Sequence, residues 1–179
     1  MEDFFENLKQ NLAKHGHQVI MVGGGKDSDE PPFHYTVGLA KYIGFEILVE
    51  ALPPDLGRVL LNDLAKVAKQ QGSLLAGIYT GLLQDQYPVA LIEADPAITD
   101  EKIGLAYACF PGRNHIPVLQ LLLSDAEKHL PWDSDYSMAG QRLLLTDPES
   151  SEAKNALSDL PTFDIEAIVR GPDLDQSIH

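Results

Sequence analysis

The sequence predicts an α+β domain with a largely antiparallel sheet of six or seven strands and about three helices. Short segments rich in β-branched and aromatic residues recur along the chain, and no regular series of helices separates them, as it would in an α/β fold. The chain has 179 residues, 44% of them hydrophobic, which is enough for one core. After residue 148 this pattern gives way to Ser, Asp, Glu and Pro. We therefore expect one globular domain over residues 1–148 and a loosely attached or disordered acidic tail over residues 149–179.

Three segments have the apolar periodicity of helices. The first covers residues 3–15. The second, residues 54–71, is the clearest, because Pro53 and the residues after it provide a favourable helix start and its apolar positions keep to one face. Thr99 is expected to cap a short third helix that runs to about Phe110.

The strands are predicted from short apolar runs between turn residues. The expected strands are 19–22, 33–39, 46–52, 74–83, 87–94, 118–123 and 141–146. The second and third are close enough in the chain to pair as a hairpin.

The charge of the chain limits its partners. It carries 13 basic and 27 acidic side chains, a net charge of −14. Nucleic acid and anionic lipid would be repelled by this field, so we expect no binding to nucleic acid or membranes. A basic protein partner or a small molecule is the expected ligand. The single cysteine, Cys109, and the lack of a long apolar run predict a cytoplasmic protein.

Several local motifs are incomplete. Gly23-Gly24-Gly25 precedes Lys26, but a phosphate-binding loop needs a glycine where Ile20 stands and Ser or Thr where Asp27 stands. The histidines lack metal-ligand spacing, and Asp125 and His129 are interpreted as a solvated turn. We therefore expect no metal and no cofactor. A flavin-binding split barrel is suggested only by the number of strands.

Two segments collect polar and aromatic residues of unusual type. The first holds His34, Tyr35 and Thr36 on a predicted strand, and the second holds Trp132 and Asp133 in a predicted loop. An aromatic wall with a few polar groups is typical of a binding pocket, so we expect the two segments to meet and line one. In the alternative interpretation, Tyr35 packs in the core and Trp132 covers one end of it.

The same segments resemble a family of bacterial proteins catalogued as domain of unknown function 4262. The resemblance covers about residues 15–140, with a Tyr-Thr-Val-Gly-Leu strand at Tyr35–Leu39 as its first motif. The later matching residues are Leu119, Gln120, Asp125, Pro131, Trp132 and Asp133. The resemblance implies no particular activity.

These observations favour a non-catalytic binding or interaction protein for a protein partner or a small molecule. The alternative is a small hydrolase or transferase with a pocket near His34, Tyr35 and Asp133.

Overall fold

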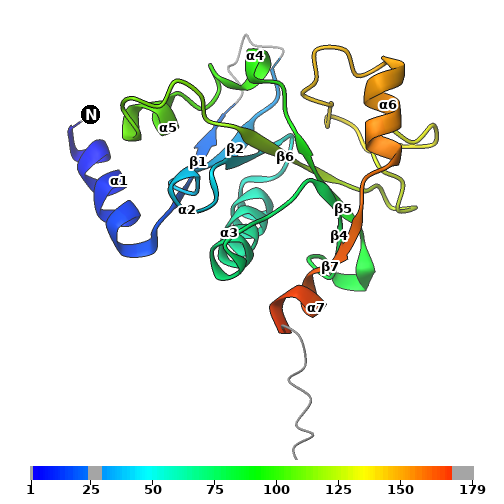
Figure 1. Ribbon diagram of the computed structural model, residues 1–179, viewed down its shortest axis with the longest axis horizontal. Coiled ribbons are helices and arrows are strands. Elements are labelled where there is room, and N and C mark those ends of the chain that lie inside the picture. The colour runs from blue at the N-terminus through cyan, green and yellow to red at the C-terminus, as the bar shows by residue number, and fades with distance from the viewer. Residues whose placement is uncertain (1, 24–29, 171–179) are drawn as a thin grey trace, which may run out of the picture.

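The fold is built on one seven-stranded sheet with helices on both faces (Figure 1). The computed structural model describes residues 2–23 and 30–170, so the Gly24-Gly25-Lys26 part of the glycine-rich stretch and residues 171–179 lie outside the described residues. The strand order is β1-β2-β3-β6-β5-β4-β7. The strands are β1 (Gln18–Val22), β2 (Phe33–Val37), β3 (Glu46–Glu50), β4 (Gly77–Thr80), β5 (Val89–Glu93), β6 (Val118–Leu123) and β7 (Thr162–Asp164).

The helices differ widely in length. They are α1 (Glu2–His15), α2 (Ala40–Ile43), α3 (Pro54–Gln71), α4 (Pro96–Thr99), α5 (Gly104–Cys109), α6 (Ser151–Ser158) and α7 (Ile165–Arg170), with a 3₁₀ turn, η1 (Gln84–Gln86), between β4 and β5. The prediction of about three helices is thus only partly right. Among the described residues, no helix is both long and apolar enough to cross a membrane.

The sheet is mixed, so an α+β fold is confirmed but a largely antiparallel sheet is only partly right. The pairs β1–β2, β2–β3, β4–β5 and β5–β6 are antiparallel. The pairs β3–β6 and β4–β7 are parallel. The first parallel pair arises because the chain leaves the central β3 and returns to its neighbour only after α3, β4 and β5. The predicted hairpin of β2 and β3 is confirmed.

Two layers of helices enclose the sheet. Helix α3 buries Leu61 and Leu64 against one face, where they meet Ile47 and Leu121. Its ends agree with the prediction, since proline occupies the first turn and Gly72 adopts a left-handed conformation at the end. Helices α1 and α5 cover the other face at the β1–β2 end, and α6 covers that face at the β5–β4 end (Figure 1).

Two predicted elements differ from the structure. The single helix expected from Thr99 is instead α4 followed by α5, because Asp95 caps α4 through Ala97 N–H and Thr99 is the last residue of that helix. The strand expected at 141–146 is not formed. The amide of Gln120 donates to Arg142 O (2.7 Å) and accepts from Leu144 N–H (2.8 Å), so a side chain holds this segment across the sheet in place of a strand ladder.

The segment expected to be a loose tail contains α6, β7 and α7 in its described part. Strand β7 forms the edge of the sheet beside β4, and the Phe163 ring lies 5.1 Å from the Tyr79 ring. Leu157 and Ile165 are buried. The strength of this attachment stays a prediction, and these contacts favour a firm one.

We expect Leu157→Ala to lower the free energy of unfolding by about 2–5 kcal/mol, as leucine-to-alanine changes in cores do. Urea unfolding of the full chain measures this change. Leu56→Ala, at a partly exposed position of α3, is the matched control and should cost much less. A loss at Leu157 no larger than that of the control would show that the segment after residue 148 is loosely attached.

Candidate functional site

Tyr35 and His34 point to opposite faces of β2. Tyr35 is buried with Phe33 and Leu48 on the face covered by α1 and α5, and its ring stacks 6.1 Å from that of Phe33. Burial, opposed by a hydrogen bond with the backbone of Leu105, raises the pKa of the Tyr35 hydroxyl to about 12. The side chain is therefore part of the core, and its hydroxyl is not an accessible acid.

His34 is buried on the other face, against the first turns of α3. A Cβ atom added at Gly57 would lie 2.7 Å from Nδ1 of His34, so this glycine is what allows the ring to fit under the helix. Within the described structure, Nδ1 of His34 has no hydrogen-bond partner. Burial lowers the pKa of His34, which keeps the imidazole uncharged at neutral pH. The ring packs the helix onto the sheet.

Thr36 belongs to a buried carboxylate site centred on Glu46. The hydroxyl of Thr36 donates to Glu46 Oε2 (2.7 Å), and the N–H groups of Gly38 and Ala40 donate to Oε1 at 2.8 and 3.1 Å. A further bond comes from Leu39 N–H (3.2 Å). The residues after Tyr35 in the Tyr-Thr-Val-Gly-Leu motif therefore enclose an acid and lead the chain from β2 into α2.

Gly38 is required for this turn. Its φ of +115° is unfavourable for other residues, and a Cβ atom there would lie 2.5 Å from the carbonyl oxygen of Gly16. Burial is the main reason that the pKa of Glu46 is raised to about 7, although its hydrogen bonds oppose the rise. The carboxyl group is fully enclosed, so it is a structural group that titrates near neutral pH.

Trp132 and Asp133 lie in a turn after β6. Asp133 accepts a hydrogen bond from Leu130 N–H (2.7 Å), and Trp132 is half-buried against the hydrophobic cluster that contains Leu122. Asp125, which we interpreted as part of a solvated turn, is instead buried. Burial alone would raise the pKa of Asp125, but hydrogen bonds from the N–H groups of His129 and Ser137 together have the larger opposite effect. The pKa is therefore below its usual range. Asp125 and Asp133 therefore fix the turns that follow β6.

Tyr35 and Trp132 lie on the same face of the sheet but pack in separate clusters. Tyr35 packs with residues near α1 and α5, whereas Trp132 packs with residues of β5 and β6. Between them, the segment held by Gln120 crosses the sheet. Five cavities on the described surface are lined by residues other than the five predicted ones.

A second buried acid, Glu50, lies at the end of β3 in an ion-pair cluster. Lys102 Nζ lies 3.2 Å from one carboxylate oxygen of Glu50, and Arg142 Nε lies 3.0 Å from the other. Lys102 also contacts Glu30 at 2.8 Å and lies over the Phe33 ring, 4.6 Å from its centre. The cluster joins β3 to the segment after α4 and to the segment held by Gln120.

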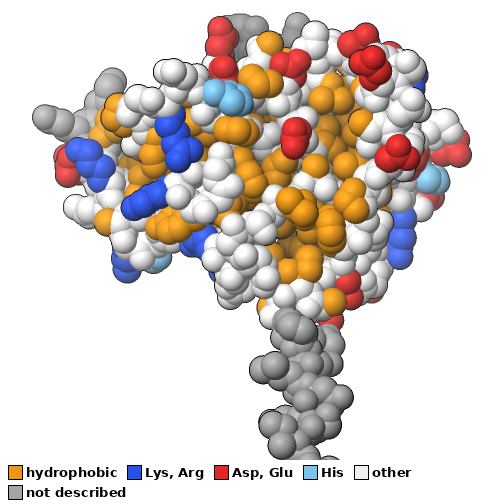
Figure 2. Space-filling view, in the orientation of Figure 1, with side chains coloured by type: hydrophobic (Ala, Val, Ile, Leu, Met, Phe, Trp, Pro, Cys, Tyr) orange, Lys and Arg blue, Asp and Glu red, His pale blue; other side chains and the backbone are white. Residues whose placement is uncertain are grey.

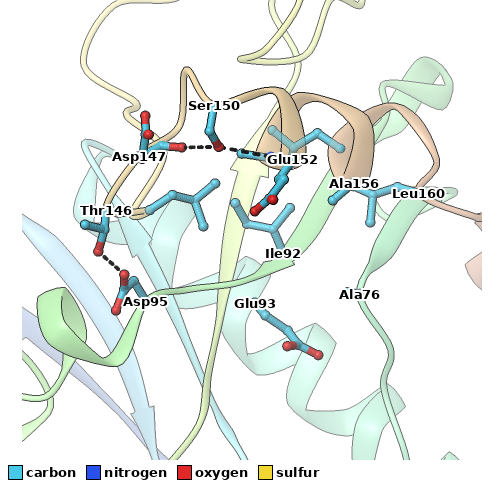
Figure 3. A pocket seen from close by; sticks show the side chains of 13 residues that line it. Ala76, Ile92, Glu93, Asp95, Thr146, Asp147, Ser150, Glu152, Ala156 and Leu160 are labelled. Atoms are coloured by element: carbon cyan, nitrogen blue, oxygen red, sulfur yellow. Dashed lines mark hydrogen bonds between the residues drawn. The ribbon is translucent and has the colours of Figure 1, made fainter.

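An opening with both apolar and charged walls lies between α6 and the end of β5, and we call it the α6 groove (Figure 3). Its volume is about 460 Å³. The apolar part of its wall comes from Ile92, Leu145, Leu157 and Leu160 with Ala76, Ala153 and Ala156. Its polar part comes from Glu93, Asp95, Thr146, Asp147, Ser150 and Glu152. In the surface view, hydrophobic side chains cover a large part of the face that holds the end of β5 and α6 (Figure 2).

Four carboxylates line the α6 groove: Glu93, Asp95, Asp147 and Glu152. Within the described part of the chain, none of them forms an ion pair with Lys or Arg. The hydroxyl of Thr146 and the N–H of Ala97 hold the pKa of Asp95 below its usual range. The groove therefore presents negative charge beside an apolar floor, without a Lys or Arg partner in the described part of the chain.

Sequence reasoning missed the α6 groove for a physical reason. Glu93 and Asp95 lie at the end of an apolar strand, which was a usable signal, but Asp147 directly follows a predicted strand that is not formed, and Glu152 falls in the stretch interpreted as a tail. The cavity exists because α6 folds back over β5. Among the described residues, no group of three or more His, Cys, Asp or Glu is placed to hold a metal ion.

We expect Lys102→Met to lower the free energy of unfolding by about 3 kcal/mol, because it removes one partner from a buried carboxylate. Glu50 would keep only Arg142. Lys66→Met is the control, since Lys66 pairs with Asp63 on the surface of α3 and such pairs contribute about 0–1 kcal/mol. Equal losses in the two variants, measured by urea unfolding, would show that the Glu50 cluster contributes no more than a surface pair.

Glu46 should make the stability of the fold depend on pH. Between 4.5, the ordinary pKa of a glutamate, and about 7, its pKa in the fold, the folded chain binds more protons than the unfolded chain. The free energy of unfolding therefore falls as pH rises through this window. The advantage of the wild type over Glu46→Gln should therefore shrink by up to about 3 kcal/mol between pH 5 and pH 8. Urea unfolding across that range measures it, with the exposed Glu127→Gln as control. An advantage that grows with pH would mean that the hydrogen bonds outweigh burial.

Comparison with known proteins supports the resemblance seen in the sequence. A search of curated proteins found no match, and neither did a search of solved structures. The family model described as domain of unknown function (DUF4262) matches residues 11–137, which include the Glu46 site and the turns after β6 but not α6. Because the match covers more than half of the chain, this protein belongs to the DUF4262 family.

Proposed function

We propose that this protein is a non-catalytic binding protein of the bacterial cytoplasm that holds a basic, partly apolar segment of a partner protein in the α6 groove. The observation that carries the proposal is the combination, in one cavity, of an apolar floor with four carboxylates that form no ion pair with Lys or Arg among the described residues. A bound lysine or arginine side chain can lay its methylene groups on such a floor while its charge meets the carboxylates.

The charge of the whole chain supports a basic partner. With a net charge of −14, the protein attracts cations over its surface and speeds their approach to the groove. The bacterial origin is supported by the family resemblance, and the cytoplasmic location by the single Cys109, whose pKa burial raises.

The geometry favours binding over the alternative enzyme. His34, Tyr35 and Asp133 do not line any of those five cavities, and each is engaged in packing or in a turn. In the α6 groove, the side chains are carboxylates, hydroxyls and apolar groups, without a histidine, cysteine or lysine. This set suits recognition of a cation by charge and shape.

The test uses a capped peptide of alternating lysine and valine, about eight residues long. A peptide in which glutamate replaces lysine is the charge control, and spermine represents a small cation without an apolar side chain. We expect the lysine peptide to bind in isothermal titration calorimetry, with an affinity that falls between about 50 and 200 mM salt. Spermine should bind more weakly, because it gains less from the apolar floor.

The triple variant Glu93→Gln, Asp147→Asn, Glu152→Gln should weaken this peptide about tenfold, from roughly 0.5 kcal/mol for each rim charge. Glu127→Gln is the matched control, because Glu127 is exposed in the turn after the end of β6, whereas Glu93 lies beside the start of β6. If the triple variant and Glu127→Gln bind the lysine peptide equally well, the proposed groove is not the site. If the glutamate peptide binds as well as the lysine peptide, charge does not select the ligand.

A further inference from the structure

The hydrogen-bond ladder between β4 and β5 stops short at the α6 groove. Strand β5 pairs with β6 as far as Glu93, which lies opposite Leu119. On its other side, β5 pairs with β4 only as far as Leu91, which lies opposite Gly77. The next hydrogen-bonded pair between β5 and the chain before β4 would join Glu93 to Leu75, and it is not formed.

The hydroxyl of Tyr79 explains the missing pair. It donates to the carbonyl oxygen of Leu75 (2.8 Å) and accepts from the N–H of Leu75 (3.3 Å). Both main-chain groups that would otherwise meet Glu93 are therefore occupied by a buried side chain. The chain bends at Ala76, and the segment before β4 leaves the sheet.

The main chain of Glu93 consequently faces the gap. In an antiparallel strand, the N–H and C=O groups of successive residues point to alternate sides. Ala94 N–H bonds Val118 O on the β6 side, so the N–H and C=O of Glu93 point to the β4 side. Among the described residues, neither group has a hydrogen-bond partner. An open backbone edge of this kind is where an added strand can bind.

Two cavities meet at this edge, one on each face of the sheet. The α6 groove lies on the side of Ile92 and Leu157. The neighbouring cavity, of about 390 Å³, lies on the side of Leu74 and Leu119, which pack in the α3 cluster. Glu93 and Ala76 line both cavities. Successive side chains of an extended segment point to opposite faces, so a strand added here would place them alternately in the two cavities.

We propose that the partner segment binds in extended conformation as a short added strand on β5, with main-chain hydrogen bonds to Glu93. This inference rests on the proposed function, because it assigns a binding mode to the same groove. Basic side chains enter the α6 groove, which holds Asp95, Asp147 and Glu152. Apolar side chains enter the neighbouring cavity, whose apolar walls include Leu74, Leu75 and Phe45, with the Glu93 side chain on the same face of the sheet. Main-chain bonds then supply affinity, and the two cavities supply selectivity.

The first experiment removes hydrogen-bond donors from the lysine–valine peptide. One version carries N-methyl groups on every valine and another on every lysine. An added edge strand uses only one of its two edges, and the N–H groups of alternate residues lie on one edge. We expect one version to lose about tenfold or more in affinity while the other stays within about threefold of the parent peptide. Equal affinities, or equal losses, in the two versions would overturn the added strand.

The second experiment changes the protein. Both Glu93→Pro and Glu93→Gln remove the carboxylate, but only Glu93→Pro also removes the backbone N–H at the open edge. We expect Glu93→Pro to bind the parent peptide about tenfold or more weakly than Glu93→Gln. If the proline variant does not fold, hydrogen exchange of the Glu93 amide in the wild type replaces it, and the peptide should slow that exchange. An unchanged exchange rate with the peptide bound would overturn the inference.

The failures of the two proposals can be distinguished. If the parent peptide does not bind, or binds the triple groove variant as well as the control, the proposed function fails. If binding depends on the groove carboxylates but not on N-methylation or on the Glu93 amide, only the added strand fails.

Discussion

The side-chain amide of Gln120 is the interaction on which the arrangement of this molecule most depends. Gln120 lies in the middle of β6 and bonds Arg142 O and Leu144 N–H, and Gln141 in turn donates to Glu50 O. These bonds fix a non-helical segment across the sheet and set the point from which the chain enters α6. The position of α6, and with it one wall of the groove, follows from these few polar contacts inside an apolar surface. Buried amides that bond the backbone on both sides are well suited to this role, because any other placement of the segment would leave them unpaired.

The two ends of β3 carry buried carboxylates that are stabilised by different kinds of neighbours. Glu46 is surrounded by N–H groups and a hydroxyl, so its charge meets dipoles. Glu50 meets Lys102 and Arg142, so its charge meets ions. The Glu46 site fixes the turn between β2 and β3, and the Glu50 cluster joins distant segments to β3. Removing a charged group from water is costly, and such clusters favour one arrangement of the chain more than they add net stability.

The sequence was most informative where local chemistry decides the structure. The boundaries of α3 followed from Pro54 and Gly72, and β6 from an apolar run that only Gln120 interrupts. The apolar period could not show that Gln120 would replace a strand at 141–146, because a side-chain amide bonding to a distant backbone leaves no periodic signal. The residues Thr36 and Gly38 lie in the motif that carries the family resemblance, but their role in enclosing Glu46 depends on a residue after the following turn. The groove depends on contacts between residues about fifty positions apart, and spacing along the chain does not reveal them.

The make-up of the α6 groove determines whether a ligand of one family member should also bind another. The residues matched by the family model end at 137, and they include Glu93 at the end of β5 and Asp95 just after it. The opposite wall, with Asp147, Glu152 and Leu157, comes from the chain beyond that point. In a relative that shares only the matched part, the end of β5 would not be covered by a helix. A ligand identified for one member would then be transferable to another only if the second member also carries the covering helix and its acids.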